Sequence, residues 1–142
     1  MAGWSRYMDR EQSQINELAT YQKTEEMQRK ALVPDEALDS KKGMAAQYTH
    51  LGNTYTKHGE LDKAEEMYRK GLAVYEALGS KEGMAANYGN LGFLYEKRGN
   101  LDNAEEMHRK SLRLFQEMGD TNAQRAQQAL DQLAQERNTS TQ

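Results

Sequence analysis

The three histidines are the side chains best suited to ligate a metal ion or to transfer protons near neutral pH. His50 and His58 lie eight residues apart on one predicted helix, and this separation of about two turns is too large for them to share one ion. His108 stands where an earlier sequence repeat has Tyr68, so its side chain is predicted to pack or to lie on the surface. Cysteine is absent. The sequence therefore predicts neither a metal site nor a cofactor.

Adjacent glutamates recur at 25–26, 65–66 and 105–106, and paired carboxylates can perform acid–base chemistry. They do so only when they are buried opposite each other. Neighbouring residues of a helix point in different directions, and these glutamates have basic residues one turn further along the chain. No serine has a matching His and Asp constellation, and no glycine-rich phosphate loop occurs. The glutamates are therefore interpreted as a solvated helix face, and the chain is predicted not to be an enzyme.

Charge and hydropathy narrow the class of protein further. The 19 basic and 22 acidic residues are interleaved and give a net charge of −3. Without a basic stripe to collect phosphates, nucleic acid is not an expected partner. No apolar run has the length that spans a bilayer, and the first residues lack the apolar core of a signal peptide. We expect no membrane partner and a cytoplasmic location.

The chain repeats itself with a period of forty residues. Residues 21–60 and 61–100 match at about half of their positions, and a third copy opens at residue 101. A fixed period of this size is typical of stacked-helix arrays, whose units bury a core only against one another. Apolar residues recur at helical spacing, as at Tyr48, Leu51 and Tyr55. The sequence therefore predicts an all-α fold, an α-solenoid of antiparallel helix pairs.

Each repeat reads as a first helix, a tight turn, a second helix and a short loop, with glycine after each helix. Gly52 and Gly92 lie inside predicted helices, where glycine is costly, so they are predicted to mark a close approach of the partner helix's backbone. Serine or aspartate lies near the start of each helix and is predicted to cap it. These predicted caps are Ser40, Ser80, Asp62 and Asp102.

The copies and their departures divide the chain into parts. Pro34 falls within an expected helix, where it removes a backbone donor and clashes with the preceding turn, so a break is predicted there. A polar segment with a thin apolar stripe follows the last copy and is predicted to close the stack. The predicted parts are a degenerate N-terminal repeat at 1–42, repeats at 43–80 and 81–120, a capping helix at 121–136 that Asp120 or Thr121 begins, and a disordered tail at 137–142.

Seven positions of each faithful repeat resemble the signature of the tetratricopeptide repeat family. They are Tyr48, Leu51, Gly52, Tyr55, Ala64, Tyr68 and Gly71 in one copy and Tyr88, Leu91, Gly92, Tyr95, Ala104, His108 and Ser111 in the next. The forty-residue period is similar to the long-repeat branch of the family, as in kinesin light chains and G-protein-signalling modulators. The resemblance implies a right-handed superhelix whose first helices line a concave groove that takes up a peptide.

Helical spacing selects the residues that would face such a groove. The first repeat contributes Thr49, Asn53, Thr56 and Lys57, the second contributes Phe93 and Lys97 beside Gly89 and Glu96, and His50 and Asn90 flank them. The resemblance implies that Asn53 and Asn90 hold the backbone of a peptide, since an amide offers one acceptor and two donors. The alternative is that both are ordinary helix-surface residues. Phe93 indicates an apolar pocket, and Lys57 and Lys97 favour acidic ligands.

The predicted function is therefore a protein–protein adaptor that binds a peptide or a partner helix in its groove. One alternative is a self-assembling structural module, and another is a regulatory segment of a larger signalling protein. The first twenty residues lack the repeat signature. They are interpreted either as an eroded terminal repeat or as an arm that docks on a second subunit through Trp4, Tyr7 and Met8, which makes a homodimer an expected assembly.

Overall fold

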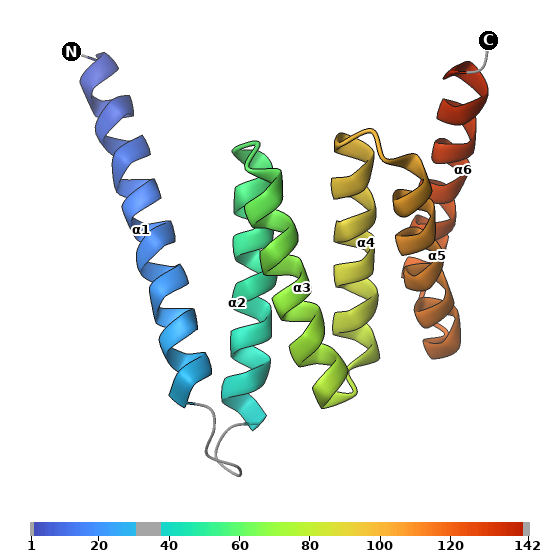
Figure 1. Ribbon diagram of the computed structural model, residues 1–142, viewed down its shortest axis with the longest axis horizontal. Coiled ribbons are helices and arrows are strands. Elements are labelled where there is room, and N and C mark those ends of the chain that lie inside the picture. The colour runs from blue at the N-terminus through green and yellow to red at the C-terminus, as the bar shows by residue number, and fades with distance from the viewer. Residues whose placement is uncertain (1, 31–37, 141–142) are drawn as a thin grey trace.

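The computed structural model describes residues 2–30 and 38–140, apart from the side chains at 2–8, 25–30, 38–39 and 140. Over these residues the backbone forms six α-helices that lie side by side in one row, with neighbours running in opposite directions (Figure 1). The helices are α1 (Ala2–Lys30), α2 (Leu38–Lys57), α3 (Leu61–Leu78), α4 (Lys81–Lys97), α5 (Leu101–Met118) and α6 (Asn122–Ser140).

Each helix packs against its neighbours in the chain, as expected of a solenoid. The packing is extensive from α2 to α6, whereas α1 packs mainly on α2 and does so more loosely. It also reaches α3, where Nζ of Lys70 lies 5.7 Å from the centre of the Tyr21 ring. One continuous core runs along the row and is built from the apolar stripes that the sequence predicted. Its largest fully buried apolar side chains are Tyr48, Leu51, Met67, Leu91, Leu94 and Leu133. The predicted all-α solenoid is confirmed.

Glycines inside the helices make room for the rings of the partner helices. A Cβ added to Gly52 would lie 2.5 Å from Cε1 of Tyr68, and one added to Gly92 would lie 2.5 Å from Cε1 of His108. The predicted close approach is therefore confirmed, but a side-chain ring makes it rather than the partner's backbone. Glycines also end the helices as predicted: Gly59 and Gly99 have left-handed φ angles of 77° and 78°.

The helix starts differ in part from the predicted caps. Ser80 does cap α4, since its Oγ accepts from the Gly83 amide at 3.3 Å. Ser40 does not cap α2, because that helix already begins at Leu38. The second helices start with a leucine that precedes the predicted aspartate, so Asp62 and Asp102 lie in the first turn and are not caps.

The cap positions of the second helices are Glu60 and Asn100. Glu60 makes no capping hydrogen bond with its side chain, whereas the Asn100 side chain accepts from the Asn103 amide. At the start of α6, Asp120 accepts from the Asn122 amide at 2.8 Å, as predicted.

The two ends of the row also differ from expectation. Residues 2–30 form one uninterrupted helix, so the first twenty residues run directly into the segment that matches later second helices. Pro34 lies outside the described residues, and the break predicted there stays a prediction. The last helix continues to Ser140, so residues 137–140 are helical rather than part of a disordered tail. Helix propagation explains this, since no proline or glycine follows Gly119.

Candidate functional site

A hollow of about 440 Å³ lies between α4, α5 and α6, on the face formed by the first helices of the repeats. The floor comes from α5, and α4 and α6 form the two walls. Small residues on the walls, among them Ala86, Gly89 and Ala129, leave the space open. The other lining residues are Ala85, Asn90, Phe93, His108, Ser111, Phe115, Asn122, Arg125, Ala126, Gln128 and Gln132. Asn90 and Phe93, predicted from the sequence, therefore lie on one wall of the same hollow.

Phe93 is a large apolar side chain that the fold leaves 53% exposed. Its ring packs edge to face with that of His108, with the ring centroids 4.8 Å apart at an interplanar angle of 73°. His108 is fully buried, and its Nε2 lies 3.1 Å from Oε2 of Glu96. The ring of Phe93 is thus supported from within while much of its surface stays open to a ligand.

The rim of the hollow is rich in amides and carries one cation. Asn90 lies on α4, and Asn122, Gln128 and Gln132 lie on α6 together with Arg125. Amides both donate and accept hydrogen bonds, and arginine pairs with carboxylates in a bidentate manner. This arrangement suits a ligand with an apolar side chain, a hydrogen-bonding backbone and a carboxylate.

The residues predicted on α2 lie at a different junction, between α2, α3 and α4, and are engaged within the protein. The Thr49 hydroxyl contacts Oδ1 of Asn87 at 2.9 Å, and Asn87 is fully buried. Asn53 accepts from the Tyr68 hydroxyl at 2.6 Å through Oδ1. Thr56 donates to the Gly52 carbonyl at 2.8 Å. Burial raises the pKa of Tyr68, so its hydroxyl keeps its proton and remains a donor at neutral pH.

The remaining predicted residues do not line the α4–α6 hollow. His50 faces the other way and lines a smaller hollow of about 370 Å³ between α1 and α2. Lys57 and Lys97 are exposed in the last turns of α2 and α4. The structure therefore brings Asn90 and Phe93 together and leaves His50, Lys57 and Lys97 apart from them.

The residues of the α6 wall were not among the site residues predicted from the sequence. Its polar residues were interpreted as the solvated side of a capping helix. Asn122, Arg125, Gln128 and Gln132 follow one another at steps of three or four residues, which places them on one helix face. That periodicity is the signal that predicts a second wall, but it becomes meaningful only once α6 is known to pack beside α4.

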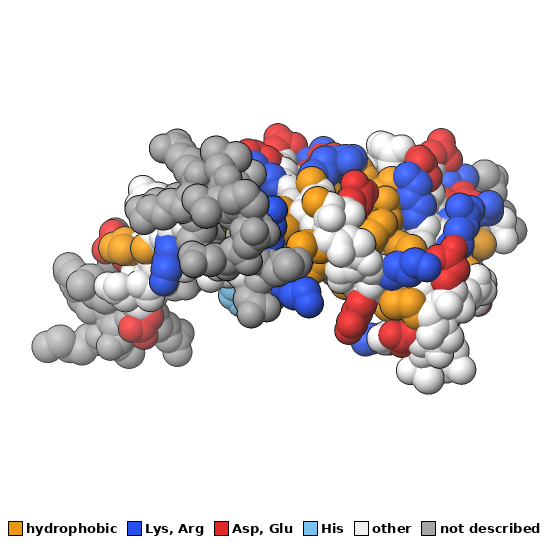
Figure 2. Space-filling view, turned by 90° about the horizontal axis from the view of Figure 1, so that it is seen from below, with side chains coloured by type: hydrophobic (Ala, Val, Ile, Leu, Met, Phe, Trp, Pro, Cys, Tyr) orange, Lys and Arg blue, Asp and Glu red, His pale blue; other side chains and the backbone are white. Residues whose placement is uncertain are grey.

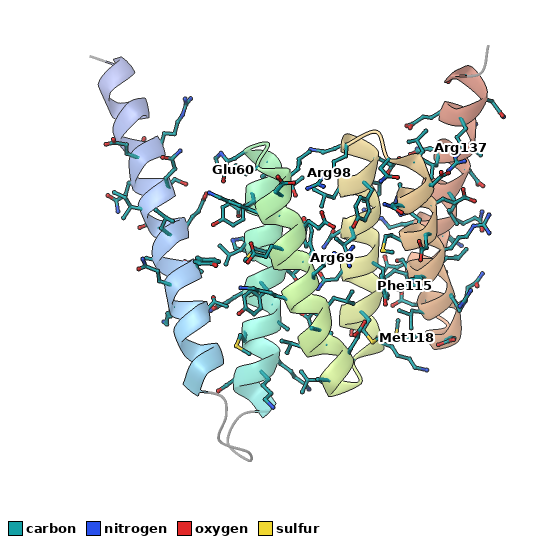
Figure 3. All side chains as sticks on the ribbon, viewed as in Figure 1. Glu60, Arg69, Arg98, Phe115, Met118 and Arg137 are labelled. Atoms are coloured by element: carbon teal, nitrogen blue, oxygen red, sulfur yellow. The ribbon has the colours of Figure 1, made fainter. Side chains whose placement is uncertain are left out.

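Arginines on the side of the row away from the hollow link each repeat to the next. Arg98, at the end of α4, contacts Asp62 at 2.5 Å and Glu65 at 3.2 Å, both on α3. Arg137 on α6 contacts Asp102 at 2.7 Å and Glu105 at 3.1 Å, both on α5. Figure 3 labels both arginines, which lie near the same edge of the row. These contacts join α4 to α3 and α6 to α5 at equivalent positions of the row.

The Glu65 carboxylate is the centre of the first of these links. It accepts from Tyr95 at 2.5 Å and from Arg69 at 3.1 Å. Burial by itself raises the pKa of Glu65, but these hydrogen bonds and the charge of Arg98 outweigh it, so the pKa is lowered. The same environment acts on Tyr95, whose pKa is raised by burial and by the nearby Glu65 carboxylate.

Among the described residues, no three His, Cys, Asp or Glu side chains converge as metal ligands would. In the same part of the chain, no helix is both long and apolar enough to cross a membrane.

Comparison with known proteins gives a family and a fold. A family model described as a tetratricopeptide repeat matches residues 43–117. The crystal structure of BtubC (BKLC) from P. vanneervenii is similar over 69% of this chain, with 20% sequence identity and a TM-score of 0.48. The match covers 48% of that protein, so this chain spans about half of its length. No curated protein matches the sequence.

Proposed function

Because this chain belongs to the tetratricopeptide repeat family, we propose that it is an interaction adaptor that binds a peptide in the hollow between α4 and α6. Repeats of this family generally mediate protein–protein interaction. The proposal places that interaction at a particular junction of the row and assigns roles to the side chains around it.

The observation that carries the proposal is the exposed ring of Phe93 beside a hollow of about 440 Å³. An exposed apolar side chain next to a concave, partly apolar surface is typical of a binding site. We infer that an apolar side chain of the peptide enters the hollow and packs on Phe93 and Phe115. Asn90 and Gln128 then hydrogen-bond the peptide backbone, and Arg125 pairs with a carboxylate of the ligand.

The residues on α2 extend this surface in the proposal but contribute less. Oδ1 of Asn53 already accepts from Tyr68, so the amide nitrogen is the group that Asn53 offers a ligand. Thr49, Thr56 and His50 are engaged with or face other parts of the fold. Lys57 and Lys97 are exposed and favour a ligand with acidic flanks through their charge, a contribution that salt weakens.

The proposal is tested with a library of fluorescent peptides of random sequence, each screened for binding to the full chain. We expect the retained peptides to share an apolar residue followed or preceded by Asp or Glu. Phe93→Ala should weaken their binding by about tenfold or more, because it removes the anchor surface. Asn90→Ala should weaken it less, since it removes one neutral hydrogen bond.

Gln124→Ala is the matched control, because Gln124 is exposed on α6 and does not line the hollow. Its affinity for the same peptides should equal that of the wild type. Unchanged affinity in Phe93→Ala, with its fold intact by circular dichroism, would remove the α4–α6 hollow as the binding site.

A further inference from the structure

The two outer helices of the described row, α1 and α6, both leave surface exposed. Residues 21–30 of α1 match the start of a second helix, yet no first helix of their own repeat packs on them, because α1 continues straight to Ala2. On that extension Ile15 and Leu18 are 57% and 56% exposed. At the other end, α6 takes the place of a first helix and no second helix follows it within the described residues. Within the described residues, each outer helix of the row thus exposes surface that a neighbouring helix covers at the inner junctions.

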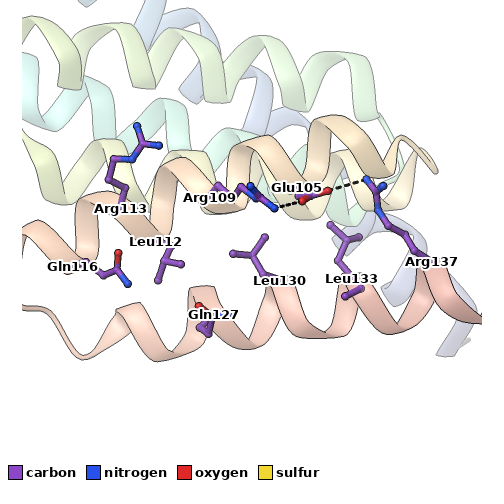
Figure 4. Close-up of a pocket in the computed structure, with 10 residues that line it drawn as sticks. Glu105, Arg109, Leu112, Arg113, Gln116, Gln127, Leu130, Leu133 and Arg137 are labelled. Carbon is purple, nitrogen blue, oxygen red and sulfur yellow. Dashed lines mark hydrogen bonds and ion pairs between the residues drawn. The ribbon is translucent and has the colours of Figure 1, made fainter.

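The α6 end carries a hollow of about 500 Å³ on the side of α5 and α6 away from the peptide groove. Figure 4 shows Leu112 and Leu130 facing each other across it, with the arginines along one edge. The lining residues are Glu105, Arg109, Leu112, Arg113, Gln116, Gln127, Leu130, Leu133, Ala134 and Arg137, none of which lines the α4–α6 hollow.

This hollow exists because two tyrosines are missing from α6. Arg98 and Arg137 make equivalent contacts, so they align α4 with α6. In that alignment Gln127 replaces Tyr88 and Ala134 replaces Tyr95. The two tyrosines bridge α4 to α3, through Glu76 and Glu65 respectively. The smaller residues of α6 leave the same position between α5 and α6 unfilled.

The charged residues around the α5–α6 hollow also differ from those on residues 9–20 of α1. Arg109, Arg113 and Arg137 surround the α5–α6 hollow. Glu105 pairs with both Arg109 and Arg137, while Arg113 has no carboxylate partner among the described residues. On α1, by contrast, residues 9–20 carry the carboxylates Asp9, Glu11 and Glu17 and a single basic residue, Arg10. Figure 2 shows Lys and Arg side chains interspersed with Asp, Glu and hydrophobic side chains on the right half of the face that it presents. Over the whole of α1 the five acidic and five basic residues balance, so it is the acidic stretch around Ile15 and Leu18 that fits a basic hollow with an apolar floor.

We propose that the chain assembles head to tail, with α1 of one copy seated in the α5–α6 hollow of the next. Ile15 and Leu18 enter the space that the missing tyrosines leave, against Leu112 and Leu130. The carboxylates of Asp9 and Glu11 then lie beside Arg109 and Arg113, while Glu17 keeps its contact with His58 of its own chain at 3.3 Å. The incoming α1 then lies against α5 and α6 of the neighbouring copy, so the row continues from one molecule into the next.

This contact joins two different surfaces, so it does not close on itself as a twofold dimer does and produces open chains of copies. Trp4, Tyr7 and Met8, predicted from the sequence as oligomer contacts, lie in α1, and their side chains are outside the described part of the structure. The peptide groove is not used, so the assembly and the adaptor function are independent of each other.

Sedimentation velocity of the full chain over a range of concentrations tests the proposal. We expect the average mass to rise past that of a dimer without a plateau, and to fall when salt is added, because the contact is partly electrostatic. A monomer at every concentration would overturn the proposal, and so would a plateau at the dimer.

Two variants then separate the ends. Ile15→Lys with Leu18→Lys places cations against the arginines, and Arg113→Glu with Gln127→Glu places carboxylates against α1. All four positions are exposed, so both variants should fold, and each alone should associate at least about tenfold more weakly than the wild type. Mixed together, they should form a one-to-one dimer and nothing larger, because each retains the end that the other lacks.

Arg125→Glu is the matched control, since it reverses the charge of one arginine as Arg113→Glu does, but on the groove side of α6. It should assemble as the wild type does. If the mixed variants fail to form the one-to-one dimer while each remains folded, the head-to-tail contact is wrong. A dimer formed by the Arg113→Glu, Gln127→Glu variant by itself would indicate instead a symmetric contact between two α1 helices.

Discussion

The junction that joins the two faithful repeats and the junction that joins the second repeat to α6 share one backbone plan but differ in what fills them. On the groove side, Thr49 and Asn87 meet at the first junction, whereas the second holds a hollow of about 440 Å³. On the opposite side, Tyr88 and Tyr95 fill the first junction, whereas Gln127 and Ala134 leave a hollow of about 500 Å³ at the second. The same position is therefore filled by side chains at the first junction and left hollow at the second.

Exchanging the residues that fill the two junctions has the largest expected effect. Tyr95 is 6% exposed and bonded to Glu65 and Arg69, so Tyr95→Ala should lower the free energy of unfolding by about 3 kcal/mol. Ala134→Tyr makes the opposite exchange and should not destabilise the protein, since it fills an existing space. It should also block head-to-tail assembly. Urea denaturation and sedimentation measure the two effects, and a Tyr95→Ala variant as stable as the wild type would show that the two junctions do not differ in packing.

Gly92 tests whether the ring contacts of the two repeats are equally tight. A Cβ at this position meets the buried His108 ring, so Gly92→Ala should cost about 2 kcal/mol of stability. Gly52→Ala should cost a similar amount against Tyr68. Gly43→Ala is the control, because no atom lies within 4 Å of an added Cβ there, and alanine should stabilise α2 by up to about 1 kcal/mol. Thermal denaturation would contradict the prediction if all three variants moved in one direction.

Phe93→Asn gives the second repeat the residue that the first repeat has at the same position. It should reduce the affinity for peptides selected by the wild type by about tenfold, while stability changes by only about 1 kcal/mol, the worth of the lost contact with His108. The reciprocal Asn53→Phe should not create a binding site, because Thr49 and Asn87 already fill that junction. Fluorescence titration of both variants measures this, and tight binding to Asn53→Phe would show that the filled junction is not what excludes a ligand.

The Glu65 link predicts a dependence of stability on pH. Its pKa is lowered in the folded protein from the ordinary 4.5, so the charged carboxylate stabilises the fold above that pH and the contribution is lost as the pH falls through the lowered value. Glu65→Gln should therefore be less stable than the wild type at neutral pH, by about 0.5–1 kcal/mol for a partly exposed network. The difference should vanish in acid. A constant difference in urea denaturation from pH 7 to acid would contradict the assignment.

The smallest expected effect concerns the starts of the second helices. Asn100 caps α5 with its side chain, whereas Glu60 does not cap α3. Glu60→Asn should therefore stabilise the protein, and Asn100→Ala should destabilise it, by about 0.5 kcal/mol each. Thermal denaturation measures both. If Glu60→Asn had no effect while Asn100→Ala did, the two helix starts would not be equivalent.

The fold could be predicted from the sequence because the residues that pack the helices recur in each copy, whereas the residues of the candidate site do not. Tyr48, Leu51 and Gly52 recur with their neighbours forty residues later, and each copy supports the interpretation of the other. Asn90 and Phe93 could be placed on the groove by the same spacing. The α6 wall could not, because its residues share no signature with earlier first helices. Ser40 and Asp62 were assigned as caps from residue type, but helix starts depend on the preceding leucine and on tertiary packing.

The regular arginine links have a consequence for how such a chain can change over generations. Arg98 pairs with Asp62 and Glu65, and Arg137 pairs in the same way with Asp102 and Glu105. The contact between one unit and the next is therefore the same at both junctions. An in-frame duplication or loss of one forty-residue unit would bring together surfaces that already fit. A single genetic event can therefore lengthen or shorten the row without requiring a new interface between units.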